Sequence, residues 1–366
     1  MLTQSKPWRL SVAPMMDWTD RHCRFFHRLI SRHTRLYTEM VTTGALMHGD
    51  LPRHLDFDAA EQPLALQLGG SEPDDLARSA RLARQWGYQE VNLNCGCPSE
   101  RVQRGAFGAC LMAEPTLVRD SVKAMRDVLG SDLAVTVKHR IGIDRIESYE
   151  FVRDFVGTVA EGGCDVFIVH ARNAWLQGLS PKENREVPPL RHELVHRLKQ
   201  EFPQLTVVVN GGITTGAQIA EQLAQVDGVM VGREAYHHPC LMADWDARFW
   251  GDGVAPEVDD DWRMDLEQRM LAYIERMQAL QGTPWSHITR HLLGLWNGQP
   301  GARRWRQVWS NHRLKSLPAR DVARLAHAAR LGHPAAGDSI TIERPKAGRS
   351  RPPPVGIKQS GKATFA

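Results

Sequence analysis

Two stretches, VFIVHA at residues 166–171 and TVVVNGG at residues 206–212, decide the fold of this 366-residue chain. Each places four consecutive apolar or β-branched residues directly before polar or glycine residues. Neither shows the alternation of a strand that has one face in water. Strands buried on both faces have such continuous runs, which are typical of a parallel sheet covered by helices. The two stretches therefore predict a parallel β-sheet within an α/β domain.

Similar runs predict eight short strands within the first 240 residues, at 10–13, 36–38, 64–68, 90–93, 133–137, 166–169, 206–209 and 228–231. Helical periodicity lies between several of them, as at residues 74–85, 115–128 and 148–160. Eight strand–helix repeats over this length predict a (β/α)8 TIM barrel. An open doubly wound sheet is the alternative. Such a sheet usually has a Gly-rich phosphate loop after its first strand, and APMMDWTD at residues 13–20 is not one.

The chain changes composition after the predicted barrel. The segment GDGVAPEVDDD at residues 251–261 is rich in Gly, Pro and acidic residues and predicts a linker. Helical patterns at 262–280, 284–297, 302–315 and 318–331 predict a small helical bundle. The Gly-, Pro-, Lys- and Arg-rich end is typical of a disordered basic tail. We predict a barrel over residues 1–250, a linker over 251–261, a helical domain over 262–332 and a tail over 333–366.

Composition narrows the class of protein. Hydrophobic residues make up 42% of the chain and charged residues 24%, as in ordinary globular proteins. The longest apolar runs are far shorter than the about 18 residues of a membrane span, and the start of the sequence has no apolar signal region. The six cysteines include no CxxC pair, so neither a disulfide framework nor a metal site is expected. We expect a cytoplasmic protein without membrane contact.

Charge is distributed unevenly along the chain. Residues 1–260 contain 28 Lys and Arg against 35 Asp and Glu, a net charge of −7. The corresponding net charges are +6 for residues 261–342 and +5 for residues 343–366. An acidic body with two basic C-terminal segments indicates a polyanionic partner bound from the C-terminal side. Arg-rich helices that merely face solvent are the alternative at this point.

Polar, sulfur-bearing or glycine residues follow every predicted strand. In a barrel of this kind the loops at the C-terminal ends of the strands carry the chemistry. We therefore expect one pocket to be lined by the residues at these ends. The candidates are Pro14, Met15, Met16, Glu39, Gln67, Asn94, Cys97, Lys138, His170, Asn210, Gly211, Gly212, Gly232 and Arg233.

The last two strands predict a phosphate site. Gly211, Gly212 and Gly232 let an anion approach bare backbone, and Arg233 adds a guanidinium group. Lys138 adds a fixed positive charge, and the carboxamide of Gln67 can both donate to and accept from the edge of a pyrimidine-like ring. Flavin mononucleotide (FMN) has the phosphate and the ring that such a pocket requires. A sugar-phosphate substrate is the alternative.

Cys97 lies in the segment NCGCPSERVQRGAFGACLM, residues 94–112, just after the fourth predicted strand. A thiol beside bare glycine backbone and a proline turn is well placed for chemistry. Buried cysteines are more often small hydrophobic residues, and we expect that role for Cys95, Cys110 and Cys164. His170 is expected to contact the flavin phosphate or the ring.

These segments resemble those of the tRNA-dihydrouridine synthases, and most of all the A-type bacterial subfamily. The resemblance is carried by APMMDWTDRHCR (13–24), YTEMVTTGA (37–45), ALQLGGS (65–71), NLNCGCPSERVQ (92–103), VKHRIGID (137–144), HARNAWLQGLSPKENRE (170–186), DGVMVGREAY (227–236) and HITRHLLGLWNGQPGARRWR (287–306). GLSPKENRE and the last segment are specific to that subfamily. The resemblance covers about residues 12–306.

The resemblance implies an FMN-containing barrel followed by a four-helix RNA-binding domain. It implies NADPH-dependent reduction of the C5–C6 double bond of uridine in the tRNA D-loop, at positions 20 and 20a. Hydride would pass from reduced FMN N5 to uridine C6, and Cys97 would donate the proton to C5. The implied flavin contacts are Pro14, Met15, Met16, Gln67, Lys138, His170, Asn210, Gly211, Gly212, Gly232 and Arg233. Asn94 would contact the target uridine, and Lys182, Arg185, Arg303 and Arg306 would contact tRNA.

The chain departs from the family pattern in three places. Cys95 stands where an aliphatic residue is usual, His139 stands where a small polar residue is usual, and the basic tail is longer. Two other functions stay open: an FMN-dependent oxidoreductase of a free small-molecule pyrimidine, and an RNA-binding protein with a non-catalytic barrel. Activity on free uridine would favour the former, and a colourless purified protein the latter. tRNA is the expected partner of a chain that we expect to be monomeric.

Overall fold

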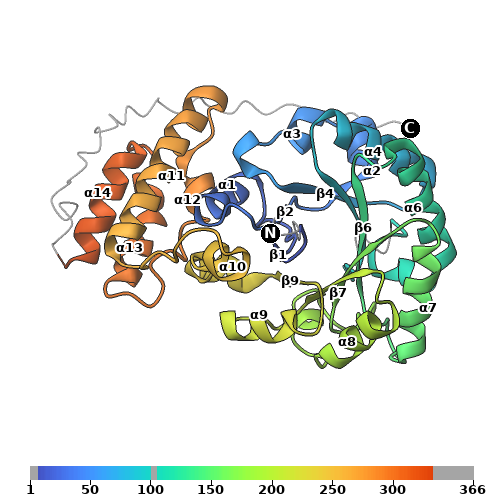
Figure 1. Cartoon of the computed structure of the whole chain (residues 1–366). Helices are drawn as coiled ribbons and strands as arrows, with labels where there is room; N and C mark the ends of the chain where they lie inside the picture. The colour runs from blue at the N-terminus through green and yellow to red at the C-terminus, as the bar shows by residue number, and fades with distance from the viewer. Residues whose placement is uncertain (1–6, 100–104, 333–366) are drawn as a thin grey trace, which may run out of the picture.

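The computed structural model describes residues 7–99 and 105–332, so the predicted tail at residues 333–366 lies outside the described residues. A β-barrel and a helical bundle lie side by side (Figure 1). The strands are β1 (Leu10–Val12), β2 (Leu36–Tyr37), β3 (Val41–Thr42), β4 (Leu64–Gly69), β5 (Glu90–Cys95), β6 (Ala134–Arg140), β7 (Val166–His170), β8 (Thr206–Asn210) and β9 (Gly228–Val231).

The helices divide between the barrel and the bundle. Those up to residue 237 are α1 (Arg21–Ile30), α2 (Thr43–His48), α3 (Leu51–Leu55), α4 (Pro73–Gln85), α6 (Pro115–Leu129), α7 (Tyr149–Ala160), α8 (His192–Glu201), α9 (Gly216–Leu223) and α10 (Arg233–His237). The later ones are α11 (Asp260–Gln281), α12 (Trp285–Thr289), α13 (Ala302–Trp309) and α14 (Ala319–Arg330). Short 3-10 helices are η1 (Ala59–Glu61), η2 (Gly108–Ala113), η3 (Glu183–Arg185), η4 (Pro239–Met242) and η6 (His312–Leu314), and η5 (Asp246–Trp250) is a π-helix.

The strands form one parallel sheet in the order β1-β9-β8-β7-β6-β5-β4-β2. Backbone bonds between β1 and Arg35 close it, because Val12 N donates to Arg35 O and Arg35 N donates to Leu10 O, each at 3.0 Å. The predicted TIM barrel and all eight predicted strands are confirmed. The short β3 was not predicted. It pairs with the end of β4 on the same side as β2, so β2 and β3 together occupy one strand position of the barrel.

The continuous apolar runs have the predicted cause, since both faces of the strands are buried. In β8, Val207 and Val209 pack in the outer layer under the helices, whereas Val208 faces the barrel interior with Ile168 and Met230. The outer layer is covered by amphipathic helices such as α4, whose Leu76, Ala80 and Ala83 are buried. N-terminal side-chain caps also stabilise the starts of helices. The side chain of Ser148, for example, accepts a hydrogen bond from Phe151 N at the start of α7.

The bundle has a hydrophobic cluster of its own, separate from that of the barrel. Trp285, Trp296, Trp305 and Trp309 are buried in this cluster together with the apolar face of α11. Phe25 and Phe26 of α1 belong to the same cluster, although they lie far away in the sequence. Phe25 stacks on Tyr273 of α11 with ring centroids 3.9 Å apart. Helix α1 therefore joins the barrel to the bundle.

Polar contacts reinforce this junction. Asp20, the N-cap of α1, contacts Arg290 Nη2 at 2.6 Å and His291 Nε2 at 3.0 Å. His22 Nδ1 lies 2.8 Å from the hydroxyl of Tyr273. These contacts link the loop after β1, at the barrel mouth, to the helical bundle.

The structure corrects the predicted boundaries of the C-terminal elements. Helix α11 begins at Asp260, so the last two residues assigned to the linker are helical. The side chain of Asp259 accepts a hydrogen bond from Trp262 N at 2.8 Å and caps the helix. Asp260 and Asp261 then lie in the first turn, where the helix dipole favours negative charge. Acidic residues that resemble a linker thus form a helix start.

The second and third helices of the bundle are shorter than predicted. Helix α12 ends at Thr289, and the chain then turns so that Gly294 packs against the barrel. A Cβ at Gly294 would lie 2.4 Å from His237 O, so this approach requires glycine. Helix α13 ends at Trp309, where the side chain of Asn311 accepts from Arg313 N and starts η6.

We expect Phe26→Ala to lower the free energy of unfolding by about 3–5 kcal/mol, because the ring is fully buried in the bundle cluster. Urea unfolding followed by tryptophan fluorescence measures the change. Leu280→Ala is the control, because that side chain is 73% exposed and its truncation should change stability by at most about 0.5 kcal/mol. Equal effects of the two substitutions would contradict the role of α1 at the junction.

Candidate active site

The C-terminal ends of the strands bring the predicted polar residues together at the barrel mouth. Asn94 Nδ2 donates to Gln67 Oε1 at 3.0 Å, and Lys138 Nζ donates to Asn210 Oδ1 at 3.2 Å. Asn94 is paired with Lys138 in the sheet, and His170 with Asn210. Residues from β4 to β8 therefore line one continuous site.

The loop after β5 carries Cys97. Strand β5 ends at Cys95, and the side chain of Asn94 then accepts from Gly96 N and Cys97 N, each at 3.0 Å. The Cys97 carbonyl accepts from Ala109 N at 2.9 Å, which ties the loop to the start of η2. Cys97 is partly exposed, and its Sγ lies 3.6 Å from Ser99 Oγ. The thiol is held at the mouth by a backbone with fixed hydrogen bonds.

Cys95 has a different environment, although it lies only two residues away. Its side chain is fully buried in the outer hydrophobic layer of the barrel. Burial raises the pKa of the Cys95 thiol well above its usual range, so the thiol stays protonated and inert. His139 is likewise buried outside the barrel interior, between Phe155 and Phe167. Neither departure from the family pattern lies in the site.

Strand β6 places two cations at the mouth. Lys138 and Arg140 are two residues apart on the strand and therefore point to the same side. Burial, aided by the nearby Arg140, lowers the pKa of Lys138 to about 7, while Cys97 acts in the opposite direction. A lysine with this pKa changes charge near neutral pH, and perturbed groups of this kind cluster at functional sites.

Sequence reasoning missed Arg140, which is buried beside the site. Its guanidinium donates to Gly96 O at 3.1 Å, to Asn173 O at 3.1 Å and to Asn184 O at 2.8 Å. It thereby joins the Cys97 loop to the loop after β7. Its spacing from Lys138 is the signal that could have revealed it.

The environment of His170, at the end of β7, favours the neutral imidazole. Burial lowers its pKa well below its usual range, and the nearby cations Arg140, Lys138, Arg172 and Arg185 lower it further. The ring lies against Gly211, because a Cβ on that glycine would come within 2.7 Å of His170 Cδ2. The concentration of cations on this side of the mouth makes it attractive to an anion.

The loops after β8 and β9 have the bare backbone that the sequence predicts. Gly211 and Gly212 have φ values of 115° and 70°, which L side chains rarely adopt. A Cβ on Gly212 would also lie 2.3 Å from Leu190 Cδ1. Gly232 directly precedes Arg233, whose guanidinium forms an ion pair with Glu186 at 2.6 Å. Arg233 would therefore have to exchange this partner in order to bind a phosphate.

The loop after β1 contributes Pro14, Met15 and Met16. Met15 N donates to Thr19 Oγ1 at 2.9 Å, and Met15 O accepts from Trp18 N and Thr19 N. These bonds form a compact turn. Met16 is 52% exposed, so the loop presents an apolar surface at the mouth.

The residues predicted to contact tRNA fall into two groups. Lys182 and Arg185 are exposed on the loop after β7, which the buried Asn184 anchors through bonds to Trp175 and Leu179. Arg303 and Arg306 lie on α13 in the bundle, so they come from a different part of the molecule than the mouth residues. Arg303 is exposed, and Arg306 bonds the side chain of Asn297.

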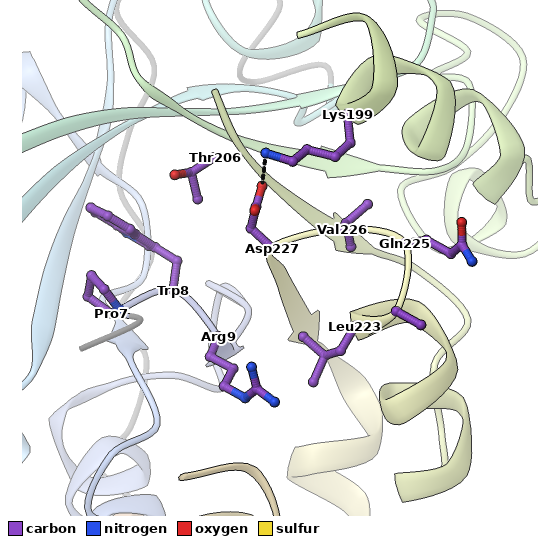
Figure 2. A pocket seen from close by; sticks show the side chains of 10 residues that line it. Pro7, Trp8, Arg9, Lys199, Thr206, Leu223, Gln225, Val226 and Asp227 are labelled. Carbon is purple, nitrogen blue, oxygen red and sulfur yellow. Dashed lines mark ion pairs between the residues drawn. The ribbon is translucent and has the colours of Figure 1, made fainter. Parts of the chain in front are cut away.

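A cavity of about 460 Å³ lies at the opposite end of the barrel (Figure 2). Its wall includes Trp8 and Arg9 before β1, Thr206 at the start of β8 and Asp227 before β9. An ion pair of 2.9 Å joins Asp227 to Lys199 there. No predicted site residue lines this cavity, and chemistry in such barrels occurs at the other end.

Residues 7–99 and 105–332 contain neither a side-chain cluster suited to a metal ion nor a helix suited to a membrane. Over that part of the chain, no three or more His, Cys, Asp or Glu side chains are grouped so that they could hold a metal ion. In the same residues, no helix has the length and apolar character needed to cross a membrane.

Comparison with solved structures supports the barrel fold. The chain is similar to histamine dehydrogenase from Rhizobium sp. 4-9, with a TM-score of 0.51 and 14% sequence identity. The similarity covers 67% of this chain and 47% of that chain. At this identity it is evidence for the fold alone.

Sequence comparison identifies much closer relatives. The tRNA-dihydrouridine(20/20a) synthase of Pseudomonas aeruginosa is 60% identical over 302 residues, which are 82% of this chain and 89% of that protein. The synthase of Vibrio cholerae is 53% identical, over 87% of this chain and 96% of that protein. The synthase of Escherichia coli K12 is 54% identical, over 88% of this chain and 91% of that protein. The sequence pattern of the family described as dihydrouridine synthase matches residues 11–330. The chain belongs to the dihydrouridine synthase family.

Proposed function

We propose that the protein reduces uridine to 5,6-dihydrouridine in the D-loop of tRNA, at positions 20 and 20a. Membership of the dihydrouridine synthase family supports the reaction, and the names of the relatives support the substrate and the positions. The observation that carries the proposal is the arrangement at the barrel mouth. There the Cys97 loop, the Asn94 amide and the Lys138 ammonium lie around one site.

The residues at the mouth fit FMN. The bare backbone at Gly211 and Gly212 would allow a close phosphate contact, because no Cβ stands beside their backbone N–H groups. The group of cations around His170 favours the negative charge of a phosphate. When bound, FMN would supply the hydride for the reduction, with NADPH as the proposed reductant.

We assign roles to the mouth residues accordingly. The phosphate would be held by Gly211, Gly212, Gly232 and Arg233, the last after release from Glu186. The ring would be held by Pro14, Met15, Met16, Gln67, Asn210 and His170. Lys138 would balance negative charge near the ring, and its pKa of about 7 in the free protein means that binding of an anion would protonate it.

Cys97 is the proposed proton donor to C5 of uridine. Its side chain is accessible, whereas the buried Cys95 is not. Asn94 is the proposed contact to the uridine ring. Since its Oδ1 accepts from two backbone amides and one N–H is used by Gln67, a single side-chain N–H is left for the substrate.

The target base has to leave its stack in the folded tRNA to reach such a pocket. Lys182, Arg185, Arg303 and Arg306 are proposed to bind tRNA phosphates and so to position one uridine at the mouth. The net charge of −7 over residues 1–260 and +6 over residues 261–342 supports binding from the side of the bundle. Because the substrate is tRNA, we propose that the reaction occurs in the cytoplasm.

A direct assay tests this function. The purified protein is incubated with NADPH and tRNA that lacks dihydrouridine, and dihydrouridine is mapped by mass spectrometry. We expect flavin in the purified protein and product at positions 20 and 20a. Reduction of free uridine at a comparable rate would favour the small-molecule oxidoreductase, and a colourless, inactive protein would favour a non-catalytic RNA-binding role.

Cys97→Ala should retain flavin and tRNA binding but lose about 10²–10⁴-fold in turnover, the usual effect of removing a positioned general acid. The measurement is single-turnover formation of dihydrouridine. Cys95→Val is the matched control and should be nearly silent, because Cys95 is a buried apolar side chain. If the Cys95 change abolishes turnover and the Cys97 change does not, the assignment is wrong.

The affinity for FMN should fall as pH rises above about 7. The free protein loses the Lys138 proton near that pH, whereas a bound anion raises the pKa, so binding takes up a proton. The affinity for FMN can fall by at most about tenfold per pH unit, up to the pH that equals the pKa of Lys138 in the complex. FMN titration of apo-protein between pH 7 and 9 measures the slope. Lys138→Met should flatten it, and Lys182→Met, at an exposed position, should not.

The double substitution Arg303→Ala/Arg306→Ala should weaken tRNA binding and reduce its salt dependence by about one unit of slope per lost phosphate contact. Positions 303 and 306 share a helix face. Arg304 instead bonds Ala329 O and Arg330 O at the end of α14, so Arg304→Ala should reduce stability more than binding. Titration of each variant with tRNA at several salt concentrations measures the affinity and its salt dependence. The assignment of tRNA contacts to Arg303 and Arg306 is wrong if deletion of the residues from Glu343 onward abolishes tRNA binding while the double variant binds tRNA normally.

A further inference from the structure

Glu90 of β5 is a fully buried carboxylate inside the barrel. Its Oε1 accepts from Tyr37 Oη at 2.8 Å and from Thr136 Oγ1 at 2.6 Å. Its Oε2 accepts from Trp8 Nε1 at 2.8 Å and lies 3.1 Å from Arg35 Nη1. A carboxylate has no hydrogen to donate, so Tyr37, Thr136 and Trp8 have to point their hydrogens at Glu90, while Arg35 contributes an ion pair.

A chain of hydrogen bonds begins at this carboxylate. Because the Thr136 hydroxyl donates to Glu90, its oxygen can only accept, and it accepts from Asn92 Nδ2 at 2.7 Å. The other end of the Asn92 carboxamide is then an oxygen, which accepts from Gln67 Nε2 at 2.7 Å. The three side chains are buried, so water does not compete for these bonds.

The same chain continues to the loop of Cys97. With its nitrogen engaged, Gln67 presents Oε1 to Asn94 Nδ2 at 3.0 Å. The Asn94 oxygen then accepts the backbone N–H groups of Gly96 and Cys97. Four side chains thus connect the barrel centre to the backbone at the proposed catalytic thiol.

The direction of the chain is determined at both ends. Glu90 can only accept, and the backbone amides of Gly96 and Cys97 can only donate. Reversal of the carboxamide of Asn92, Gln67 or Asn94 would place two donors or two acceptors against each other. Each amide therefore has one permitted orientation, and a buried mismatch would cost the desolvation of both groups.

The surroundings keep Glu90 in this role. Burial, with the neighbouring Glu90 charge, raises the pKa of Tyr37 well above its usual range, so the phenol remains a donor. Trp8 stands between Glu90 and the cavity at the far end of the barrel, where its ring forms part of the wall (Figure 2). Arg35 supplies the opposite charge and is itself anchored by its Nε to Pro7 O at 3.0 Å.

We propose that Glu90 is a positioning residue, whose carboxylate anchors the inner end of a hydrogen-bond chain through Thr136, Asn92, Gln67 and Asn94 to the backbone of Cys97. The chain presents the Gln67 carboxamide in one orientation and holds the Cys97 loop against the rigid barrel centre. Its consequences for flavin and turnover rest on the proposed function. The consequence for the loop does not, because it concerns this chain alone.

Thr136→Val tests the proposal, since valine keeps the shape of threonine and removes only the hydroxyl. Thr136→Ser is the matched variant, because it keeps the hydroxyl and loses a methyl group. In flavin-free protein, Thr136→Val should speed hydrogen exchange of peptides covering residues 94–98 by roughly two- to tenfold, the value of one hydrogen bond. Thr136→Ser should match the wild type. Mass spectrometry measures the exchange, with peptides from α13 as internal reference.

Flavin and kinetic measurements provide the second readout. Thr136→Val should weaken FMN binding by roughly two- to tenfold and lower kcat, with KM for tRNA unchanged, and Thr136→Ser should restore both. Should Thr136→Val fail to fold, Glu90→Gln is measured in the same way. That variant keeps the shape of the side chain but places hydrogens against the donors that surround it.

The outcomes separate this inference from the proposed function. Equal exchange in residues 94–98 for the valine and serine variants would overturn the inference, as would a larger defect for serine, which would indicate packing. A wild-type protein that holds no flavin and leaves tRNA unreduced would overturn the proposed function, while the exchange result would still decide the role of the chain.

Discussion

The rest of the structure depends on the backbone bonds by which Arg35 closes the parallel sheet onto β1. A closed parallel barrel has no free edge, and all its strands end at the same rim. Closure therefore gathers side chains from eight distant segments at one mouth. Gln67, Asn94, Lys138 and Asn210 become neighbours for this reason, although any two of them are at least 27 positions apart in the chain.

Closure also creates an interior that has to be filled. One level of it is apolar, with Ile168, Val208 and Met230 packed together. The side facing β5 is polar, and its groups satisfy one another in a fixed order from Glu90 to the Cys97 loop. Buried polar networks are stabilising only when every member has a partner. A network of this kind gives the mouth a rigid support that apolar packing alone, which has no direction, would not give.

The helical bundle is held to this rim through α1. Phe25 and Phe26 lie in its hydrophobic cluster, and Asp20 pairs with Arg290 at the same junction. Since α1 directly follows the loop that carries Met15 and Met16, the bundle is coupled to one wall of the mouth. If the basic bundle attracts tRNA, as we propose, this junction would bring the RNA to the same rim.

The sequence by itself determined the elements that depend on local pattern: the eight strands, because their continuous apolar runs require two buried faces, and the order of barrel and bundle. It also indicated most mouth residues, since these directly follow the strands. Tertiary structure alone decided the rest. Helix α12 ends at Thr289 and Gly294 then meets the barrel, Arg140 joins two loops, and Arg233 pairs with Glu186. The direction of the chain from Glu90 arises from contacts among strands far apart in sequence, which no local pattern records.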